Sequence, residues 1–153
     1  MRALIQRVSQ ASVDVGESTV ASIGEGLVVL VGIGRDDSDD DVTYLAEKIP
    51  HLRIFSDEAG LFNRSVLDIA GELLIVSQFT LYASTRKGRR PGFTDAAPPE
   101  EAEPLVERLV HHLRATGLHV ETGRFQQHMM VKIYNDGPVT IFVDSEERLK
   151  PRR

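Results

Sequence analysis

Two hydroxyls and an amide gather where an apolar segment of the sequence turns polar, because Ser77, Gln78 and Thr80 follow directly on the run 73–76. A strand end is a rigid platform, so hydroxyl and backbone N–H donors there can face a carbonyl group, as in an oxyanion hole. The alternative, which composition alone favours, is polar residues on an exposed strand face. No Ser-His-Asp pattern accompanies the hydroxyls, and no general base stands near Thr80 in the sequence.

Gly137-Pro138 stands at the mouth of a second apolar run, 139–143. Proline cannot donate to a strand ladder, so its place is an edge, a strand start or a bulge. A trans turn is the ordinary interpretation, since only about 5–6% of X–Pro bonds in folded proteins are cis. The functional alternative is a cis bond used as a rigid wall poor in side chains, whose carbonyl oxygens point to one side and sense the space around a chiral carbon.

The segment 84–99 is rich in Gly, Pro and Arg and is long for a loop in a compact domain; such loops are often functional. Arg86, Lys87, Arg89 and Arg90 make it the one concentrated basic stretch of the chain. The loop leaves directly from the 77–80 segment, so its cations are placed to bind phosphate groups there. A solvated loop without a partner is the alternative.

The acidic run 36–41 and the five histidines are the residues that could hold a metal ion. Acids are favoured at the positive N-terminus of a helix, and a helix is predicted to follow, so we interpret the run as a solvated loop. The histidines lack a ligand spacing such as His-Glu-x-x-His, and there is no cysteine. The sequence therefore predicts neither a metal site nor a cofactor.

The chain has 153 residues, a formal net charge of −5, 41% hydrophobic residues and 27% charged residues, which is typical of one soluble globular domain. The negative charge argues against a protein that binds nucleic acids mainly through many phosphate contacts. The N-terminus lacks the apolar run of a signal peptide, and the run 26–34 is too short to cross a bilayer as a helix. We therefore expect a cytoplasmic protein with no membrane partner.

Hydrophobic periodicity predicts more strands than helices. The expected strands are 3–8, 11–15, 19–23, 27–33, 53–55, 61–63, 73–81, 118–122, 129–134 and 139–144. Amphipathic helices are expected over 42–49, ending near Pro50, and over 100–116. Hairpins mixed with two crossover helices indicate an α/β fold, in which residues 1–153 form a single compact domain of mixed sheets packed by the two main helices. Residues 145–153 are expected to be a loose charged tail.

Two of these segments, Ser77-Gln78-Phe79-Thr80-Leu81 and Asn135-Asp136-Gly137-Pro138-Val139-Thr140, closely resemble motifs of the D-aminoacyl-tRNA deacylase family. The likeness continues in order through 3–8, 53–57, Arg90-Pro91 with Phe93, and 122–125, so that it covers the chain from Met1 to about Asp144. It implies barrel-like sheets and an editing hydrolase that cleaves the ester of D-aminoacyl-tRNA, and also of glycyl-tRNA. Members of the family are cytoplasmic homodimers with two sites at the interface. The implied partners are thus the 3′ end of aminoacyl-tRNA and a second copy of the chain.

The resemblance also implies roles for single residues. Ser77, Gln78, Phe79 and Thr80 would form the catalytic wall, whose backbone N–H groups hold the aminoacyl carbonyl. Gly137-Pro138 would be a Gly–cis-Pro motif that reaches into the partner's pocket and rejects L side chains, whereas glycine, with hydrogens on both sides, is not excluded. The matching pocket residues are Arg7, Phe93, Met129, Asn135, Val139 and Thr140, and the candidate tRNA-binding residues are Arg86, Lys87, Arg89 and Arg90. Gly92 departs from the family, which usually has serine there, so no polar contact is predicted at that position.

The mechanism and the function each keep an alternative. Thr80 is a candidate nucleophile, but the prevailing view of the family has the 2′-hydroxyl of the terminal adenosine assist the attack of water. The missing base near Thr80 favours the second mechanism. The alternative functions are a non-catalytic nucleic-acid-binding dimer and a small-ester hydrolase with Thr80 as its nucleophile.

Overall fold

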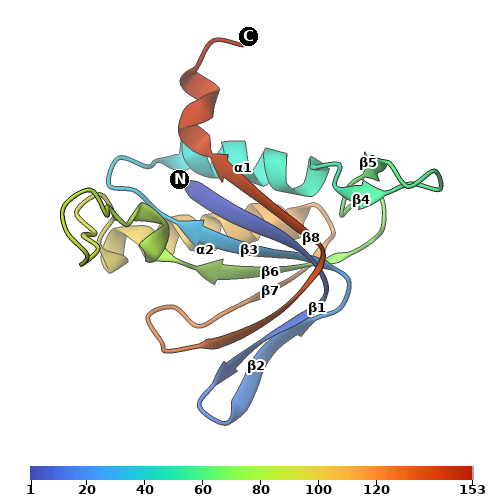
Figure 1. The fold of residues 1–153 in the computed structure, drawn as a ribbon, viewed down its shortest axis with the longest axis horizontal. Coiled ribbons are helices and arrows are strands. Elements are labelled where there is room, and N and C mark those ends of the chain that lie inside the picture. Colours follow the sequence, from blue (N-terminus) through green and yellow to red (C-terminus); the bar gives the residue numbers. More distant parts are fainter. Residues whose placement is uncertain (153) are drawn as a thin grey trace.

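One mixed sheet dominates the computed structural model, which describes residues 1–152 (Figure 1). Its strands are β1 (Arg2–Val15), β2 (Ser18–Ile23), β3 (Gly26–Gly32), β6 (Glu72–Ser77), β7 (His119–Thr122) and β8 (Met130–Asp144). They are ordered β2-β1-β3-β6-β7, and β8 pairs with β1. The short strands β4 (Phe55–Ser56) and β5 (Phe62–Arg64) form the separate hairpin that the sequence predicts.

The helices α1 (Asp39–His51) and α2 (Pro99–Ala115) belong to the crossovers that join the parallel neighbours β3, β6 and β7, and they pack against the sheet (Figure 1). The alternate side chains of β3 and β6 enter a second cluster inside the curl of the sheet, so these strands are buried on both faces and are apolar throughout. The larger cluster contains Leu27, Val29, Ile75, Leu45 and Leu109, and the smaller one contains Val8, Val13, Val28, Leu74 and Val76.

The sheet curls until it is nearly closed, as the barrel-like fold class predicts. The guanidinium of Arg124, just after β7, donates from Nη2 to the carbonyl oxygen of Val20 in β2 at 3.2 Å. This contact joins the two ends of the strand order. None of the helices in residues 1–152 is long and apolar enough to cross a membrane.

The strands β1 and β8 are each longer than predicted, because each was expected as two strands. β1 pairs with β3 over its first half and with β2 over its second half, while β8 accompanies both halves. In β8, Thr140 pairs with Gln6 and Asn135 pairs with Val8, so residues 136–139 bulge opposite the single residue Arg7. A bulge tolerates a proline within a strand, since no ladder hydrogen bond is required there.

The strand predicted over 73–81 is too long, because β6 ends at Ser77 and a 3-10 helix, η1 (Phe79–Tyr82), follows. The backbone N–H of Gln78 still donates to the carbonyl oxygen of Val31 at 2.7 Å. Beyond it the chain turns over the end of β3, at Gly32. An ideal Cβ on Gly32 would lie 3.0 Å from the Gln78 carbonyl oxygen and 3.0 Å from the Leu81 Cβ, so the turn needs a glycine beneath it.

The tail expected to be loose is docked over its first residues, and the acidic run expected to be solvated is partly buried. Residues Ser145–Leu149 form a 3-10 helix, η2, in which Ser145 is buried. Its hydroxyl donates to Asp41 Oδ1 at 2.6 Å, and Arg148 forms an ion pair with the same carboxylate. Asp41 also caps the start of α1 through Ser38, so this acid has a structural role. Residue 153 lies outside the described residues.

Candidate active site

A pocket of about 730 Å³ opens at the carboxyl end of β6. Ser77, Gln78 and Phe79, where the sequence predicts a site, form one part of its wall. The opposite walls come from the loop before α2 and from the segment between β7 and β8. No motif in the sequence predicted that these two segments would line one pocket. The lining residues that sequence reasoning missed include Ala96, Ala97, Pro98, Phe125, Gln126, Gln127 and His128.

The loop before α2 is fixed against β3. The backbone N–H of Ala97 donates to the carbonyl oxygen of Ile33 at 2.9 Å, and that of Arg35 donates to the carbonyl oxygen of Asp95 at 3.1 Å. The rings of Phe93 and Phe79 meet edge to face with centroids 5.0 Å apart. These contacts give the pocket a firm apolar wall, a surface that suits a flat aromatic group.

Thr80 is exposed on η1, and the residues that line the pocket do not include it. Its hydroxyl accepts a hydrogen bond from the side-chain amide of Gln78. An amide is not a base, and within residues 1–152 this hydroxyl has no recorded hydrogen bond to a histidine or a carboxylate. The hydroxyl of Thr80 is therefore held by an amide, and the described residues place no base beside it.

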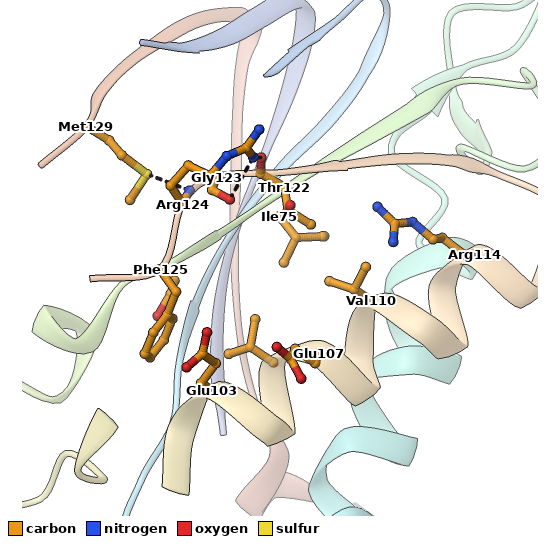
Figure 2. A pocket seen from close by; sticks show the side chains of 12 residues that line it. Ile75, Glu103, Glu107, Val110, Arg114, Thr122, Gly123, Arg124, Phe125 and Met129 are labelled. Carbon is orange, nitrogen blue, oxygen red and sulfur yellow. Dashed lines mark hydrogen bonds between the residues drawn. The ribbon is translucent and has the colours of Figure 1, made fainter. Parts of the chain in front are cut away.

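A smaller pocket of about 310 Å³ adjoins the first and shares Ser77, Phe125 and Met129 with it. Figure 2 shows Glu103 and Glu107 on α2 facing the segment that follows β7. The sulfur of Met129 lies 3.3 Å from the backbone N–H donor of Arg124. Met129, predicted as a pocket residue, therefore lines both pockets and lies between them.

The Gly137-Pro138 peptide bond is cis, and both residues are exposed. The side chain of Asn135 braces the bulge, because its Oδ1 accepts from the Val139 N–H at 2.7 Å and its Nδ2 donates to the Thr140 Oγ1 at 3.0 Å. Asn135, Val139 and Thr140, predicted as pocket residues, thus surround the dipeptide. They do not line the pocket at the end of β6.

Arg7 supports the bulge from the adjacent strand. Its Nε donates to the carbonyl oxygen of Asp136 at 2.9 Å, and its Nη1 donates to the carbonyl oxygen of Ile54 at 2.7 Å. The guanidinium also lies 5.4 Å from the centroid of the Phe62 ring. Arg7 therefore ties the bulge to the β4–β5 hairpin, away from the pocket where Phe93 and Met129 lie.

One chain does not bring the two predicted halves of the site together. Ser77 pairs with Val31, which pairs with Ala3 of β1, whereas the bulge faces Arg7 further along β1. With strands about 4.8 Å apart and about 3.3 Å per residue, Gly137-Pro138 is on the order of 20 Å from Ser77 across the sheet. Within one chain, the predicted catalytic wall and the predicted chirality screen therefore lie apart.

The basic residues Arg86, Lys87, Arg89 and Arg90 are all exposed on one projecting loop. Ser84 and Gly92 close its base by exchanging backbone hydrogen bonds of 2.8 and 2.9 Å. Within residues 1–152 no group of three or more His, Asp or Glu residues is arranged to hold a metal ion.

Nearly the whole chain matches known proteins. A family model described as D-Tyr-tRNA(Tyr) deacylase matches residues 4–144. A protein named D-aminoacyl-tRNA deacylase from Roseiflexus sp. (strain RS-1) is 60% identical to this chain, over 99% of this chain and 98% of that protein. A protein of the same name from Heliobacterium modesticaldum is 62% identical to this chain, over 94% of this chain and 96% of that protein.

Two solved structures share the fold. One titled "c-Myc DNA Unwinding Element Binding Protein" has a TM-score of 0.89 at 42% identity and covers 94% of this chain and 98% of that one. The other, titled as a probable eukaryotic D-amino acid tRNA deacylase, has a TM-score of 0.81 at 19% identity and covers 93% of this chain and 97% of that one. The chain therefore belongs to the D-aminoacyl-tRNA deacylase family, a family of hydrolases.

Proposed function

We propose that the pocket at the end of β6 receives the 3′ aminoacyl-adenosine of a D-aminoacyl-tRNA and hydrolyses its ester in the cytoplasm. The pocket of about 730 Å³ combines apolar walls, which suit a nucleobase, with the amide side chains of Gln78, Gln126 and Gln127, which suit its polar edge. The coincidence of this pocket with the Ser77–Phe79 segment, in a chain of the deacylase family, is the observation that carries the proposal.

Stabilisation of the developing oxyanion falls to backbone N–H groups of η1. Its first intrahelical hydrogen bond runs from the Leu81 N–H to the Gln78 carbonyl oxygen at 3.2 Å. The N–H groups of Phe79 and Thr80 precede it, and the first N–H groups of a helix have no intrahelical acceptor. Fixed donors of this kind stabilise a tetrahedral intermediate without reorganising during the reaction.

The tRNA itself supplies the group that assists water. The hydroxyl of Thr80 accepts from an amide, so no protein base is placed to activate it. A terminal ribose in the pocket carries a 2′-hydroxyl next to the ester, which is close enough to orient the attacking water and to relay its proton to the departing 3′-oxygen. The small-ester hydrolase with Thr80 as its nucleophile is disfavoured for the same reason.

The chirality screen comes from the second chain of a homodimer. Gly137-Pro138 is exposed and is held by Asn135 and Arg7, so it forms a stiff projection that can enter a partner's pocket. Such a projection leaves room for a hydrogen but not for an L side chain. Glycine carries hydrogens on both sides of its α-carbon, so glycyl-tRNA is also cleaved.

The loop that carries Arg86, Lys87, Arg89 and Arg90 contacts phosphates of the tRNA. It begins soon after η1, so a nucleic acid that ends in the pocket passes near it. In a chain of net charge −5, these exposed cations give affinity confined to one place.

Hydrolysis of D-Tyr-tRNA and L-Tyr-tRNA by the pure protein tests the proposal. We expect rapid release of D-tyrosine and at least about a hundredfold slower release of L-tyrosine. Equal rates, or no hydrolysis of either ester, would contradict it.

A second candidate function is non-catalytic nucleic-acid binding. One observation favours it: the 42% identical solved structure bears a title that names binding to a DNA unwinding element. This candidate expects salt-sensitive binding to DNA that outcompetes tRNA, and no ester cleavage. Competition between a D-aminoacyl-tRNA and duplex DNA in the same deacylation assay separates the two functions.

A further inference from the structure

The short helix η1, which carries Phe79 and Thr80, packs against Gly32 and Gly34, which have no side chains. An ideal Cβ on Gly34 would lie 2.9 Å from three atoms of the Tyr82 ring, and one on Gly32 would lie 3.2 Å from the same ring. Real Cβ atoms essentially never make a contact as short as that at Gly34, and the one at Gly32 is tighter than most, so a side chain at either position would displace the ring. Gly32 at the end of β3 and Gly34 just after it therefore let the Tyr82 ring pack close to the sheet, and this packing fixes the distance between η1 and the sheet.

Arg2 holds the other side of η1. Its Nη1 donates to the carbonyl oxygen of Leu81 at 3.0 Å, and its guanidinium lies 4.3 Å from the centroid of the Tyr82 ring. Its Nε donates to the carboxylate of Asp144 at 3.2 Å, which fixes the direction of the guanidinium. The last carbonyl groups of a helix lack intrahelical donors, so Arg2 supplies one to η1.

Asp37 holds the hydroxyl end of the Tyr82 ring. Its hydroxyl lies 3.4 Å from Asp37 Oδ2, which also accepts from the Gly34 N–H at 2.6 Å. Burial of Tyr82, and then the negative charge of Asp37, raise the pKa of this hydroxyl, so it stays protonated at every physiological pH. The ring is thus held between the sheet and the guanidinium of Arg2.

We propose that Arg2 and Tyr82 are positioning residues for the deacylation reaction, because they fix η1 and with it the N–H groups of Phe79 and Thr80. The inference rests on the proposed function of residues 77–80. Neither Arg2 nor Tyr82 lines the pocket. Their loss therefore lowers kcat, through misplaced donors, and leaves the KM for D-aminoacyl-tRNA nearly unchanged.

The first test replaces Arg2. Arg2→Met keeps most of the aliphatic stem and removes the donor to Leu81, so we expect kcat to fall at least about tenfold with KM within about threefold. Arg2→Lys keeps the cation and one donor, and it should restore part of kcat. The matched control is Arg108→Met, which makes the same exchange at an exposed arginine that pairs with Asp39 on the helical side; its kcat should stay within about threefold of wild type.

The second test examines whether Gly34 acts through the ring of Tyr82. Gly34→Ala places a methyl group against Tyr82 and should lower kcat as Arg2→Met does. In a Tyr82→Leu background the methyl group has less to displace, so Gly34→Ala should cause little further loss. Additive losses would show that Gly34 acts elsewhere.

A core variant separates positioning from stability. Ile49→Val removes one methyl group from α1 and lowers stability without touching η1, so its kcat should match wild type at assay temperature. If Arg2→Met lowers kcat no more than an equally destabilised Ile49→Val, the positioning role is wrong. If Phe79→Pro, which removes the backbone N–H of residue 79 at the first position of η1, leaves kcat unchanged, the assignment of the active site itself fails, whatever Arg2→Met does.

Discussion

The carboxamide oxygen of Asn135 accepts a hydrogen bond from the backbone N–H of Val139 at 2.7 Å, so one side chain spans the Gly137-Pro138 dipeptide. The same carboxamide donates to the Val139 carbonyl oxygen at 3.3 Å and to the Thr140 hydroxyl at 3.0 Å. An exposed bulge would otherwise be among the more mobile parts of a sheet. Asn135 instead makes it a fixed shape, which a stereochemical screen requires.

Replacing Asn135 by alanine should loosen this shape. We expect Asn135→Ala to lower the ratio of D-Tyr-tRNA to L-Tyr-tRNA hydrolysis at least about tenfold, and to cost about 1–2 kcal/mol of unfolding free energy through the lost hydrogen bonds. The control is Lys132→Ala, which lies on the same strand as Asn135 and removes an ion pair with Asp14 of β1. An unchanged ratio in Asn135→Ala would show that the brace does not matter for discrimination.

A side chain at Gly137 should interfere with both the bulge and its support. Gly137 has φ +140°, and an ideal Cβ there would lie 2.8 Å from the Val139 Cγ2 and 3.2 Å from the Arg7 Nη2. Gly137→Ala should therefore reduce D-Tyr-tRNA hydrolysis at least about tenfold. Gly60→Ala is a matched control, because Gly60 has φ +79° with nothing within 4 Å of its Cβ position. It should lose stability but not activity, and equal activity losses would contradict the assignment.

The source of the activating hydroxyl can be decided by removing each candidate in turn. Thr80→Ala should keep deacylation within about tenfold of wild type, because the Thr80 hydroxyl serves mainly to accept from Gln78. A D-aminoacyl-tRNA with a 2′-deoxy terminal adenosine should lose at least about a thousandfold in single-turnover rate. The reverse pattern would establish Thr80 as the nucleophile.

The basic loop should be visible in the salt dependence of substrate binding. Each phosphate contact contributes about 0.7–0.9 to the slope of log Kd against log salt concentration. Arg86→Ala combined with Arg89→Ala should lower that slope by about 1–2 and weaken tRNA binding at low salt. Arg108→Ala removes an exposed cation that pairs with Asp39 on the helical side, and it should leave the slope unchanged.

Asp41 should make the fold sensitive to acid. Burial opposes ionisation of Asp41, but hydrogen bonds from Ser145 and the Ser38 N–H and the nearby positive charges outweigh it and hold its pKa below the usual value. A carboxylate with a lowered folded-state pKa stabilises the fold above its unfolded pKa of about 3.9, and this stabilisation is lost as pH falls through the folded pKa.

The variant Asp41→Asn should therefore lose about 1–3 kcal/mol of unfolding free energy at pH 7 and less at pH 3. Urea denaturation of both proteins from pH 7 to pH 3 measures this difference. Asp40→Asn, an exposed acid in the same helical turn, should show no comparable change. A constant gap between wild type and Asp41→Asn across this range would contradict the role of the charge.

The sequence predicts most elements of this fold but not how they end or where they meet. The continuous apolar runs of β3 and β6 and the helical periodicity of α1 and α2 are local signals, and they place these elements within a few residues. The end of β6 depends on Gly32 and Gly34, which lie far away in the sequence. Similarly, Ser145 and Arg148 are polar residues in a charged tail, and only Asp41 explains why they are docked.

The sequence likewise predicts only part of the candidate site. The Ser77–Phe79 segment, where the sequence predicts the catalytic wall, lines the pocket, whereas Ala96 to Pro98 carry no motif and Phe125 was matched only as part of a family segment without a site role. Conversely, Asn135 and Thr140 belong to a recognisable motif that lies across the sheet from that pocket. Side chains supplied by distant segments, or by a second chain, leave no pattern in a single sequence.

The long ladder between β1 and β8 ties synthesis of the chain to its folding. Of the strands described, β1 is synthesised first, and β8, which accompanies it along both halves, is synthesised last. Until residues 130–144 emerge, the nascent β1 presents an open edge that another chain can extend, which is the usual starting point for aggregation. Pairing across such a separation in sequence is also slow. Production of this protein in cells should therefore depend on chaperones that shield that edge during translation.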